Sequence, residues 1–210
     1  MSKTLKTLRE TVPFEVFSDT EAALAIGGSS DRQYGIIKRA IAAGDITQIR
    51  RGLYAFARSF QRTAPNLNEL ANKIYAPSYV SLESALAHHG AIPEATYTTT
   101  SVSIKRSRTV ETPFGTFAYT GVTEFNMVGV ERHGDGGALF LMASIEKALV
   151  DYVHVRGLAW RGAAPLTDSL RFDEAILANL SGDELLEAGN SYRSRKISAF
   201  VKGLRRDLGQ

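Results

Sequence analysis

The amino-acid sequence predicts an α+β protein, helical near its N-terminus and built of both helices and strands thereafter. Three observations predict this class. Residues 32–43 carry apolar side chains at the helical period, and residues 46–56 alternate as a β-hairpin does. Residues 96–141 are rich in β-branched and aromatic side chains, which favour strands. The segments after Ala143 return to helical patterning, so strands and helices share the second part of the chain.

Two short helices are predicted at the N-terminus. The apolar residues of the first lie on one face: Leu5, Leu8 and Val12. Pro13 ends this helix, because proline lacks the backbone N–H that a helix interior needs. Asp19 is predicted to cap a second helix that runs to Ile26, and Gly27 and Gly28 then turn the chain toward a third.

The third predicted helix begins near Arg32 and stops at Gly44. Three residues can cap it by accepting hydrogen bonds from its first turn: Ser29, Ser30 and Asp31. Its apolar stripe is predicted to face a core: Ile36, Ile37, Ala40 and Ile41. The opposite face is basic, with small residues that permit close approach to another surface: Arg32, Gly35, Lys38, Arg39 and Ala42. Such a face suits the groove of a nucleic acid.

A hairpin over Ile46 to Phe56 follows this helix, with Arg50 and Arg51 just before the turn residue Gly52. A helix-turn-helix followed by such a hairpin is a winged helix-turn-helix, which predicts double-stranded DNA as a partner. Arginine can donate a bidentate pair to guanine in the major groove, and arginines on a wing can meet phosphates or a narrow minor groove. The predicted DNA contacts are Ser29, Ser30, Arg32, Gln33, Tyr34, Lys38, Arg39, Arg50 and Arg51.

Charge placement supports this prediction. Residues 32–58 hold six basic side chains and one acidic one, whereas the whole chain of 210 residues has a formal net charge of only +3. The alternative is an ordinary solvated basic face, which an amphipathic helix of any function can carry.

Two further basic groups are open to more than one interpretation. Lys105, Arg106 and Arg108 follow a predicted strand and form either a solvated loop or a secondary contact to nucleic acid or a partner. Residues 193–210 hold six basic side chains and one acidic one, after a stretch, residues 161–192, with two basic and six acidic. This basic end either complements the dipole of a terminal helix or binds nucleic acid.

A domain boundary is predicted where the apolar pattern lapses, over residues 57–66. Residues 1–62 are then the DNA-binding domain, and residues 63–210 form a mixed α/β domain. Helices of the second domain are predicted at 67–75, at 81–89 with Ser81 as its cap, from a Ser144 cap onward, and at 172–179, 183–187 and 194–208. Its predicted strands are 96–104, 116–122 and 138–141, with turns at 113–115 and 134–137.

Composition and motifs argue against several other classes. The chain has no cysteine, which removes disulfides, thiolate catalysis and cysteine-ligated metals and fits a reducing, cytoplasmic setting. Its longest apolar run, residues 138–143, is too short to cross a bilayer. No catalytic residue, metal or cofactor is predicted.

Individual chemical motifs are weak or missing. His88 and His89 are neighbours on a predicted helix and so diverge, which favours packing or capping over metal ligation. The glycine-rich residues 134–137 precede a strand and read as a turn rather than a phosphate cradle. The sequence contains no G-x-S-x-G, and no lysine has an acid two residues before it, as a nuclease of the restriction type would need.

The order of these segments resembles the AbiEi-type antitoxin family, predicted transcriptional regulators of bacterial phage-defence loci. The resemblance rests first on a Ser-led basic helix ending in A-A-G-D and on the following I-T-Q-I-R-R-G-L-Y-A-F. It continues in P-S-Y-V-S-L-E-S-A-L-A-H-H-G-A-I-P-E, residues 77–94, and in A-S-I-E-K-A-L-V-D, residues 143–151. Together these segments cover most of the chain in the family's order.

The resemblance implies the antitoxin of a type IV toxin-antitoxin system, which acts in phage defence by abortive infection. Such a protein represses its own operon by binding inverted repeats through the winged helix, while the C-terminal domain counteracts a nucleotidyltransferase-like toxin. No residue motif for neutralisation is evident in the sequence. Three alternatives stay open: a stand-alone transcriptional regulator, a protein-interaction module that uses the winged helix, and a nucleic-acid-processing enzyme with an unrecognised site.

Overall fold

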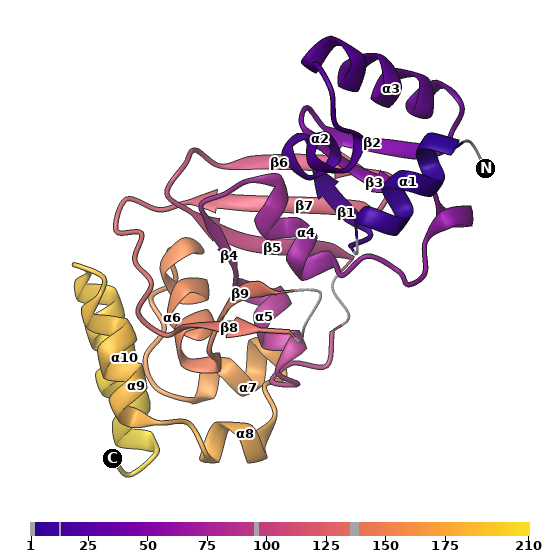
Figure 1. The fold of residues 1–210 in the computed structure, drawn as a ribbon. Helices are drawn as coiled ribbons and strands as arrows, with labels where there is room; N and C mark the ends of the chain where they lie inside the picture. The colour runs from indigo at the N-terminus through magenta and orange to yellow at the C-terminus, as the bar shows by residue number, and fades with distance from the viewer. Residues whose placement is uncertain (1–2, 13, 95–96, 135–138) are drawn as a thin grey trace.

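The computed structural model describes residues 3–12, 14–94, 97–134 and 139–210 and has an α+β fold (Figure 1). Over these residues the chain forms two sheets, one of three strands and one of six, with helices packed around both. The α+β class predicted from the sequence is therefore confirmed. None of the helices in these ranges combines the length and the apolar character that crossing a membrane requires.

The N-terminal part alternates short helices and strands before its hairpin. Its elements are α1 (Lys3–Thr11), β1 (Val16–Ser18), α2 (Asp19–Ile26), α3 (Ser30–Ala42), β2 (Ile46–Arg50), β3 (Leu53–Phe56) and a 3-10 turn, η1 (Arg58–Phe60). The three strands form an antiparallel sheet in the order β1-β3-β2. The hairpin therefore receives a third strand, β1, which the sequence pattern did not predict.

The second part is built on a six-stranded mixed sheet in the order β6-β7-β5-β4-β9-β8. Its strands are β4 (Ser78–Val80), β5 (Thr98–Ser103), β6 (Arg108–Thr112), β7 (Gly115–Gly121), β8 (Val130–His133) and β9 (Phe140–Ala143). The pairs β5/β7 and β4/β9 are parallel, and the other neighbours are antiparallel. Three of these strands, β4, β6 and β8, were not predicted, because they are short or polar and lack a period-two apolar pattern.

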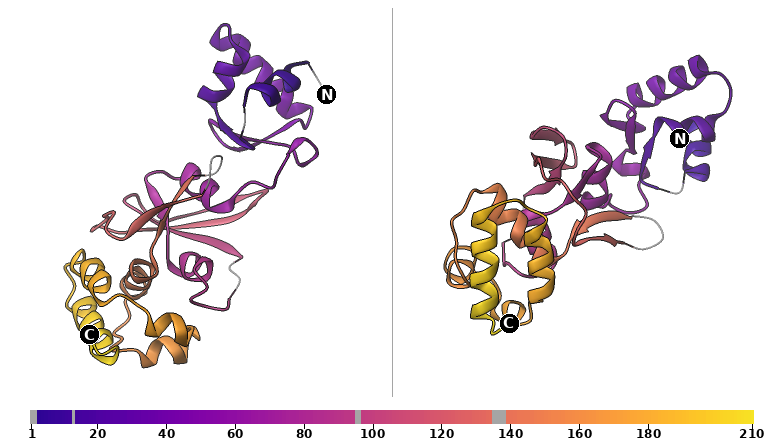
Figure 2. Two further views of the ribbon diagram at one scale, coloured as in Figure 1. Left: turned by 60° about the horizontal axis from the view of Figure 1, so that its bottom comes forward. Right: turned by 90° about the vertical axis from the view of Figure 1, so that its left-hand side faces the viewer.

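Helices line this sheet and extend away from it. They are α4 (Leu67–Ile74), α5 (Leu82–His88), α6 (Ile145–Val155), α7 (Ala164–Leu170), α8 (Glu174–Ala178), α9 (Gly182–Asn190) and α10 (Arg195–Asp207). Helix α4 contacts β4, β5 and β9, while α9 and α10 pack on α6. In all three views of the ribbon, α10 and α3 lie at opposite ends of the molecule (Figures 1 and 2). The helix α7 was missed by the sequence analysis; the others fall within a few residues of their predicted positions.

Two predicted helix caps need correction. Helix α2 is capped by Ser18, not Asp19: the Ser18 side chain accepts from the Glu21 backbone N–H, and the Glu21 carboxylate accepts from the Ser18 N–H at 2.6 Å. This reciprocal pair satisfies two free backbone donors, which the single cap predicted at Asp19 would not. Ser81 holds the N-cap position of α5, but its hydroxyl makes no capping bond and instead donates to Asp151 at 2.8 Å.

The three-stranded sheet is shared between two hydrophobic cores. One core lies under α1, α2 and α3 and includes Leu5, Leu8, Phe17, Ile37, Tyr54 and Phe56. The larger core fills the second part of the chain, yet it also takes in Val16, Ile49, Leu53 and Ala55 from the first. The larger core therefore takes side chains from both sides of the boundary predicted from the sequence. The glycine-rich residues 135–137, Pro13, and the first residues of the strands predicted at 96–104 and 138–141 lie outside the described residues.

Candidate nucleic-acid interface

Helix α3 presents a basic face on a buried support. Ile37 and Ala40 are only 6% exposed and fix the helix on the N-terminal core. The exposed residues on the outer side are Asp31, Arg32, Tyr34, Lys38, Arg39 and Ala42. Ile36 and Ile41 are half-buried at the edges of the stripe. The amphipathic pattern predicted from the sequence is thus confirmed, because burial falls on the apolar side and exposure on the basic one.

The turn between α2 and α3 is held by two residues that the sequence assigned to DNA contact. The Ser29 side chain accepts from the Arg32 backbone N–H at 3.4 Å and so caps α3. The Gln33 amide donates to the Gly28 carbonyl at 3.1 Å and lies 3.5 Å from the Ala23 carbonyl. Ser29 therefore fixes the start of α3, and Gln33 ties α3 to the end of α2 and to the turn. Ser30 is exposed as the first residue of the helix.

The hairpin turn is tied down rather than free. The Asp19 backbone N–H donates to the Gly52 carbonyl at 3.2 Å. Gly52 has φ +76°, and a Cβ on it would lie 2.9 Å from the Asp19 carboxylate, so the turn needs glycine both for its backbone and for this contact. Burial and a hydrogen bond to Asp19 raise the pKa of Tyr54, on β3, to about 12. The hairpin turn is therefore held against Asp19, the first residue of α2.

The two arginines of the hairpin have different surroundings. Arg50 donates to the Arg51 carbonyl and to the Lys73 carbonyl at the end of α4, each at 2.9 Å. Its guanidinium thus bridges the hairpin and the second part of the chain. Arg51 is exposed, and no hydrogen bond or ion pair of its guanidinium is found among the described residues. Of the two, Arg51 is the one available to an outside partner.

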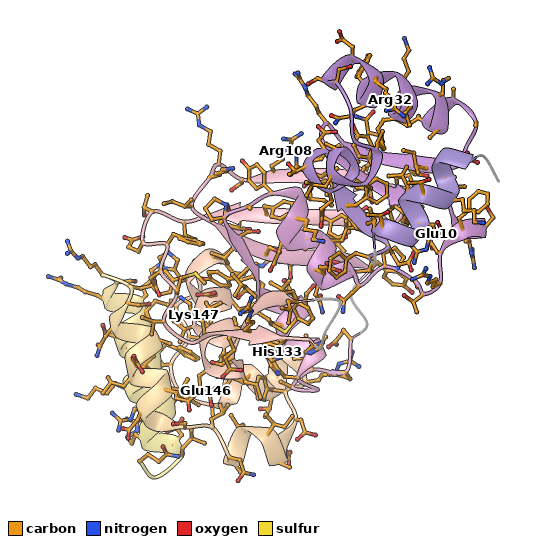
Figure 3. The ribbon with its side chains drawn as sticks, viewed as in Figure 1. Glu10, Arg32, Arg108, His133, Glu146 and Lys147 are labelled. Carbon is orange, nitrogen blue, oxygen red and sulfur yellow. The ribbon has the colours of Figure 1, made fainter. Side chains whose placement is uncertain are left out.

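Among the described residues of α3 and the hairpin turn, four cations lack an internal partner: Arg32, Lys38, Arg39 and Arg51. Within the described ranges, none of their charged groups forms an ion pair or a hydrogen bond. Arg32 extends from α3 at the outer edge of the molecule in Figure 3. Unpaired, exposed cations on one helix and the adjoining turn make a surface that attracts an anion such as a phosphate backbone.

The second basic cluster is built around Tyr75. Lys105 and Arg108 lie over the ring of Tyr75, at 5.2 and 5.9 Å from its centre, and the Tyr75 hydroxyl donates to the Arg106 carbonyl at 3.1 Å. The Tyr75 ring packs at 5.0 Å from that of Tyr119. Lys105 also donates to the Ala76 carbonyl. The predicted loop therefore holds for residues 105 and 106, whereas Arg108 is the first residue of β6.

Tyr119 shows that the two basic regions meet in space. Burial raises the pKa of Tyr119, and the positive charges of Arg50 and Arg108 act in the opposite direction. Both cations are therefore close to the same phenol, although they lie far apart in sequence. Sequence reasoning treated them as separate clusters, because nothing local indicates this proximity.

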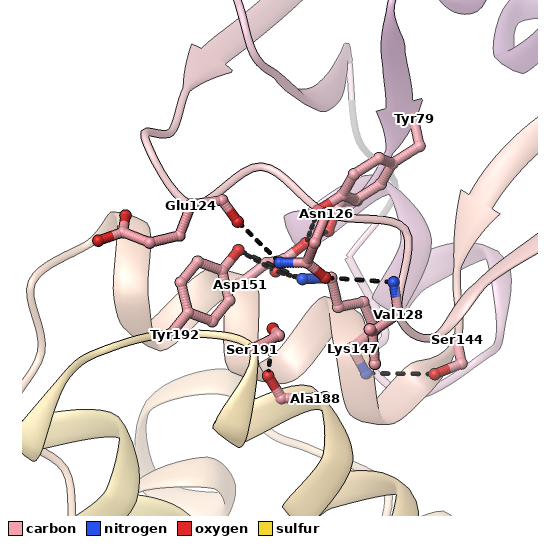
Figure 4. Close-up of polar contacts among 11 residues, drawn as sticks. Tyr79, Glu124, Asn126, Val128, Ser144, Lys147, Asp151, Ala188, Ser191 and Tyr192 are labelled. Atoms are coloured by element: carbon pink, nitrogen blue, oxygen red, sulfur yellow. Dashed lines mark hydrogen bonds and ion pairs between the residues drawn. The ribbon is translucent and has the colours of Figure 1, made fainter.

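A buried polar centre lies deeper in the second part of the chain (Figure 4). Lys147 and Asp151 are both fully buried and form an ion pair of 2.9 Å on α6. Three hydroxyls donate to the Asp151 carboxylate: Tyr79 at 3.0 Å, Ser81 at 2.8 Å and Tyr192 at 2.6 Å. The Lys147 ammonium also lies 3.3 Å from the Tyr192 hydroxyl.

This centre is sealed and its charges are matched. Burial, followed by the charge of Asp151, raises the pKa of Tyr79 and of Tyr192, so both phenols stay protonated and donate. The ring of Phe125 packs against that of Tyr79, with 5.5 Å between the ring centres. A substrate has no access to these groups in this conformation, which makes the centre a structural one. The sequence analysis noted the segment but assigned no role to Lys147 or Asp151; their i, i+4 spacing was the available signal.

The two adjacent histidines pack in a cluster of rings. His88, His89 and His133 have ring centres 5.5 to 5.9 Å apart. The His89 Nε2 lies 2.9 Å from the Ala143 carbonyl, and burial lowers the pKa of His88. Across the described residues, no group of three or more His, Cys, Asp or Glu side chains is arranged to hold a metal ion.

No protein-family model matches this chain, and no curated protein sequence matches it either. Its function has to be inferred from its residues and their geometry.

Proposed function

We propose that this protein is a sequence-specific DNA-binding transcriptional regulator whose α3 is a recognition helix. The observation that carries the proposal is the outer face of α3, where Arg32, Lys38 and Arg39 are exposed and unpaired while Ile37 and Ala40 anchor the opposite side. A helix of 13 residues spans about 20 Å, and the major groove of B-DNA, about 12 Å wide, admits such a helix.

The order of elements supports a winged helix-turn-helix in residues 1–62. Helices α2 and α3 are joined by a tight glycine turn, and α3 leads directly into the β2-β3 hairpin. The strand β1, placed before α2, pairs with β3 and backs the hairpin. In this arrangement α3 enters the major groove and the hairpin turn is the wing beside it.

Each exposed residue then has a distinct role. Arg39 and Arg32 read base edges from the groove side of α3, where arginine can bond guanine through two donors. Arg51 meets a phosphate beside the groove. Ser30, Tyr34 and Lys38 add contacts to the sugar-phosphate backbone, and Ser29 and Gln33 orient the helix. Lys105, Arg106 and Arg108 stand near the wing for a secondary contact.

The resemblance to AbiEi-type antitoxins extends the proposal. On that basis the protein represses its own operon at inverted repeats, and residues 63–210 counteract a nucleotidyltransferase-like toxin. A toxin gene beside the coding sequence, and rescue of growth when the two proteins are co-expressed, would support this part. A neighbourhood without such a gene would favour a stand-alone regulator.

A protein-binding module is the second candidate. The observation in its favour is an apolar surface on the same unit: Leu24 on α2 is 80% exposed and Tyr34 on α3 is 70% exposed. Salt distinguishes the two candidates, because DNA binding releases counterions and weakens steeply as salt rises, whereas an apolar protein contact does not.

The decisive experiment measures fluorescence anisotropy of the protein's own promoter duplex and of a scrambled duplex over a series of salt concentrations. We expect Arg39→Ala to weaken promoter binding by about 1 to 3 kcal/mol and scrambled-duplex binding much less. Arg195→Ala, an exposed arginine on α10 at the far end of the molecule, is the matched control and should change neither. Equal affinity of the wild-type protein for both duplexes at every salt concentration would refute sequence-specific regulation.

A further inference from the structure

Residues of α9 and α10, together with Arg161, line a hollow. These two helices lie at the end of the molecule remote from α3 (Figures 1 and 2). The volume of the hollow is about 710 Å³. The residues that line it include Arg161, Leu186, Ala199, Lys202, Arg205 and Arg206. Neither the core of the chain nor the candidate nucleic-acid interface uses these side chains.

Glycines let the segments around the hollow pack closely on one another. A Cβ on Gly189 of α9 would lie 2.8 Å from the Val201 side chain of α10. A Cβ on Gly203 would lie 2.8 Å from the backbone nitrogen of Gly162. Ala199, on α10, is exposed and lines the hollow with only a methyl group.

The hollow is strongly cationic. Four of its lining residues are basic and none is acidic. Arg205 and Arg206 have only long contacts with carboxylates, 3.5 Å to Asp183 and 3.4 Å to Asp207. The Nε of Arg205 is buried without a hydrogen-bond partner. Arg161 and Lys202 make no ion pair or side-chain hydrogen bond within the described ranges.

We propose that this hollow docks an acidic, helical segment of a partner protein. Its carboxylates would pair with Lys202, Arg205 and Arg206, and its apolar residues would cover Leu186, which is 40% exposed. Helix-in-groove recognition of this kind combines a spaced apolar anchor with a complementary charged rim. The surface is independent of the proposed DNA contacts, because α10 and α3 are at opposite ends of the molecule.

A protein segment fits the surroundings better than a nucleic acid. Asp183 and Glu187 are exposed on α9 directly beside the hollow. A phosphate backbone, which carries a charge at every step, would meet these carboxylates as well as the basic residues. A peptide can place its acids opposite α10 and leave other residues opposite α9. The exposed Leu186 likewise has a use in a protein contact and none in binding phosphate.

The test uses the full-length protein and a labelled helical peptide of about twenty residues built from Glu, Leu and Ala, with glutamates four residues apart. Fluorescence anisotropy should show binding, and Lys202→Glu/Arg206→Glu should weaken the peptide's affinity by about tenfold or more. The control Arg193→Glu/Arg195→Glu makes the same change of charge near the start of α10 and outside the hollow, and should leave the affinity nearly unchanged. Ala199→Trp fills the floor without a change of charge and should also abolish binding.

Three results would overturn the proposal. One is failure of the peptide to bind, or equal binding by a peptide with glutamine in place of glutamate. Another is an equal loss in the control variant, which would mean a diffuse effect of net charge. The third is displacement of the peptide by a short DNA duplex but not by excess unlabelled peptide, which would assign the hollow to nucleic acid. Circular dichroism spectra that match wild type establish that each variant is folded.

Discussion

At the scale of single residues, the deepest polar feature is the pair Lys147 and Asp151. Taking two charges out of water costs several kcal/mol for each ion, and this is offset only where the geometry is good and the remaining groups are hydrogen-bonded. Here both carboxylate oxygens accept hydroxyls, from Tyr79, Ser81 and Tyr192. The pair therefore joins β4, α6 and the segment before α10 at one point.

Replacing one member of the ion pair should lower the free energy of unfolding. Lys147→Met leaves the Asp151 carboxylate buried without its counterion, and we expect a loss of about 3 to 5 kcal/mol in the free energy of unfolding, measured with urea. The double variant Lys147→Met/Asp151→Asn removes both charges and should lose less than Lys147→Met alone. If the losses of Lys147→Met and Asp151→Asn, each measured alone, add up to the loss of the double variant, the two charges are not coupled.

Arg39 and Arg51 differ from Arg50 in whether the guanidinium already has a hydrogen-bond partner within the protein. The first two have no internal acceptor among the described residues, whereas the Arg50 guanidinium is held by two carbonyls. A position beside a turn is therefore not enough to assign a contact. What matters is whether the side chain is already in use.

At the scale of elements, the hairpin β2-β3 serves two purposes. It follows α3 closely enough to act as a wing, and it is fastened to α2 through Asp19 and to α4 through Arg50. Such fastening fixes the direction of the wing relative to α3 and lowers the entropy lost on binding.

The wing offers a sharp comparison between neighbouring arginines. Arg51→Ala should weaken promoter and scrambled duplex alike, and it should lower the magnitude of the slope of log K against log salt by about one unit, because one phosphate contact is lost. Arg50→Ala should leave that slope nearly unchanged, since its guanidinium is bound to Lys73. Titrations of both variants over a salt series measure the two slopes. The assignment fails if the Arg50 variant loses the unit of slope and the Arg51 variant does not.

At the scale of the whole molecule, the three-stranded sheet couples the two parts of the chain. One face carries Phe17 and Phe56, which pack in one core with Ile37 of α3, and the other face sends Ile49 and Leu53 into the larger core. Lys73 reaches back across the boundary, with its ammonium 3.5 Å from the Val16 carbonyl. Residues 1–62 therefore share a hydrophobic core with the second part of the chain.

This coupling predicts one cooperative unfolding transition. Leu53→Ala leaves a cavity at a residue only 3% exposed and should cost about 2 to 5 kcal/mol. The single tryptophan, Trp160, lies in the second part beside Tyr152 and reports on it by fluorescence. The fluorescence and circular dichroism midpoints should shift together in urea. A fluorescence midpoint that stays at its wild-type value while the circular dichroism signal changes early would show that the two parts unfold separately.

The sequence by itself determined the local features. The α+β class, the amphipathic α3 with its Ser29 cap, the hairpin around Gly52 and the Ser144 cap of α6 all follow from period, turn chemistry and capping, which involve residues within a few positions of one another. Four of the predicted contact residues, Arg32, Lys38, Arg39 and Arg51, are also found exposed and unpaired within the described ranges.

The tertiary structure decided everything that depends on distant pairing. Short strands such as β4 and β6 formed because neighbouring strands supply their hydrogen bonds. The Arg50 guanidinium binds the Lys73 carbonyl, and both Arg50 and Arg108 lie near Tyr119, so these contacts join segments 20 or more residues apart. The ion pair of Lys147 and Asp151 depends on the core that surrounds it. Such contacts are chosen by how faces pack, and a linear pattern carries no record of which faces will meet.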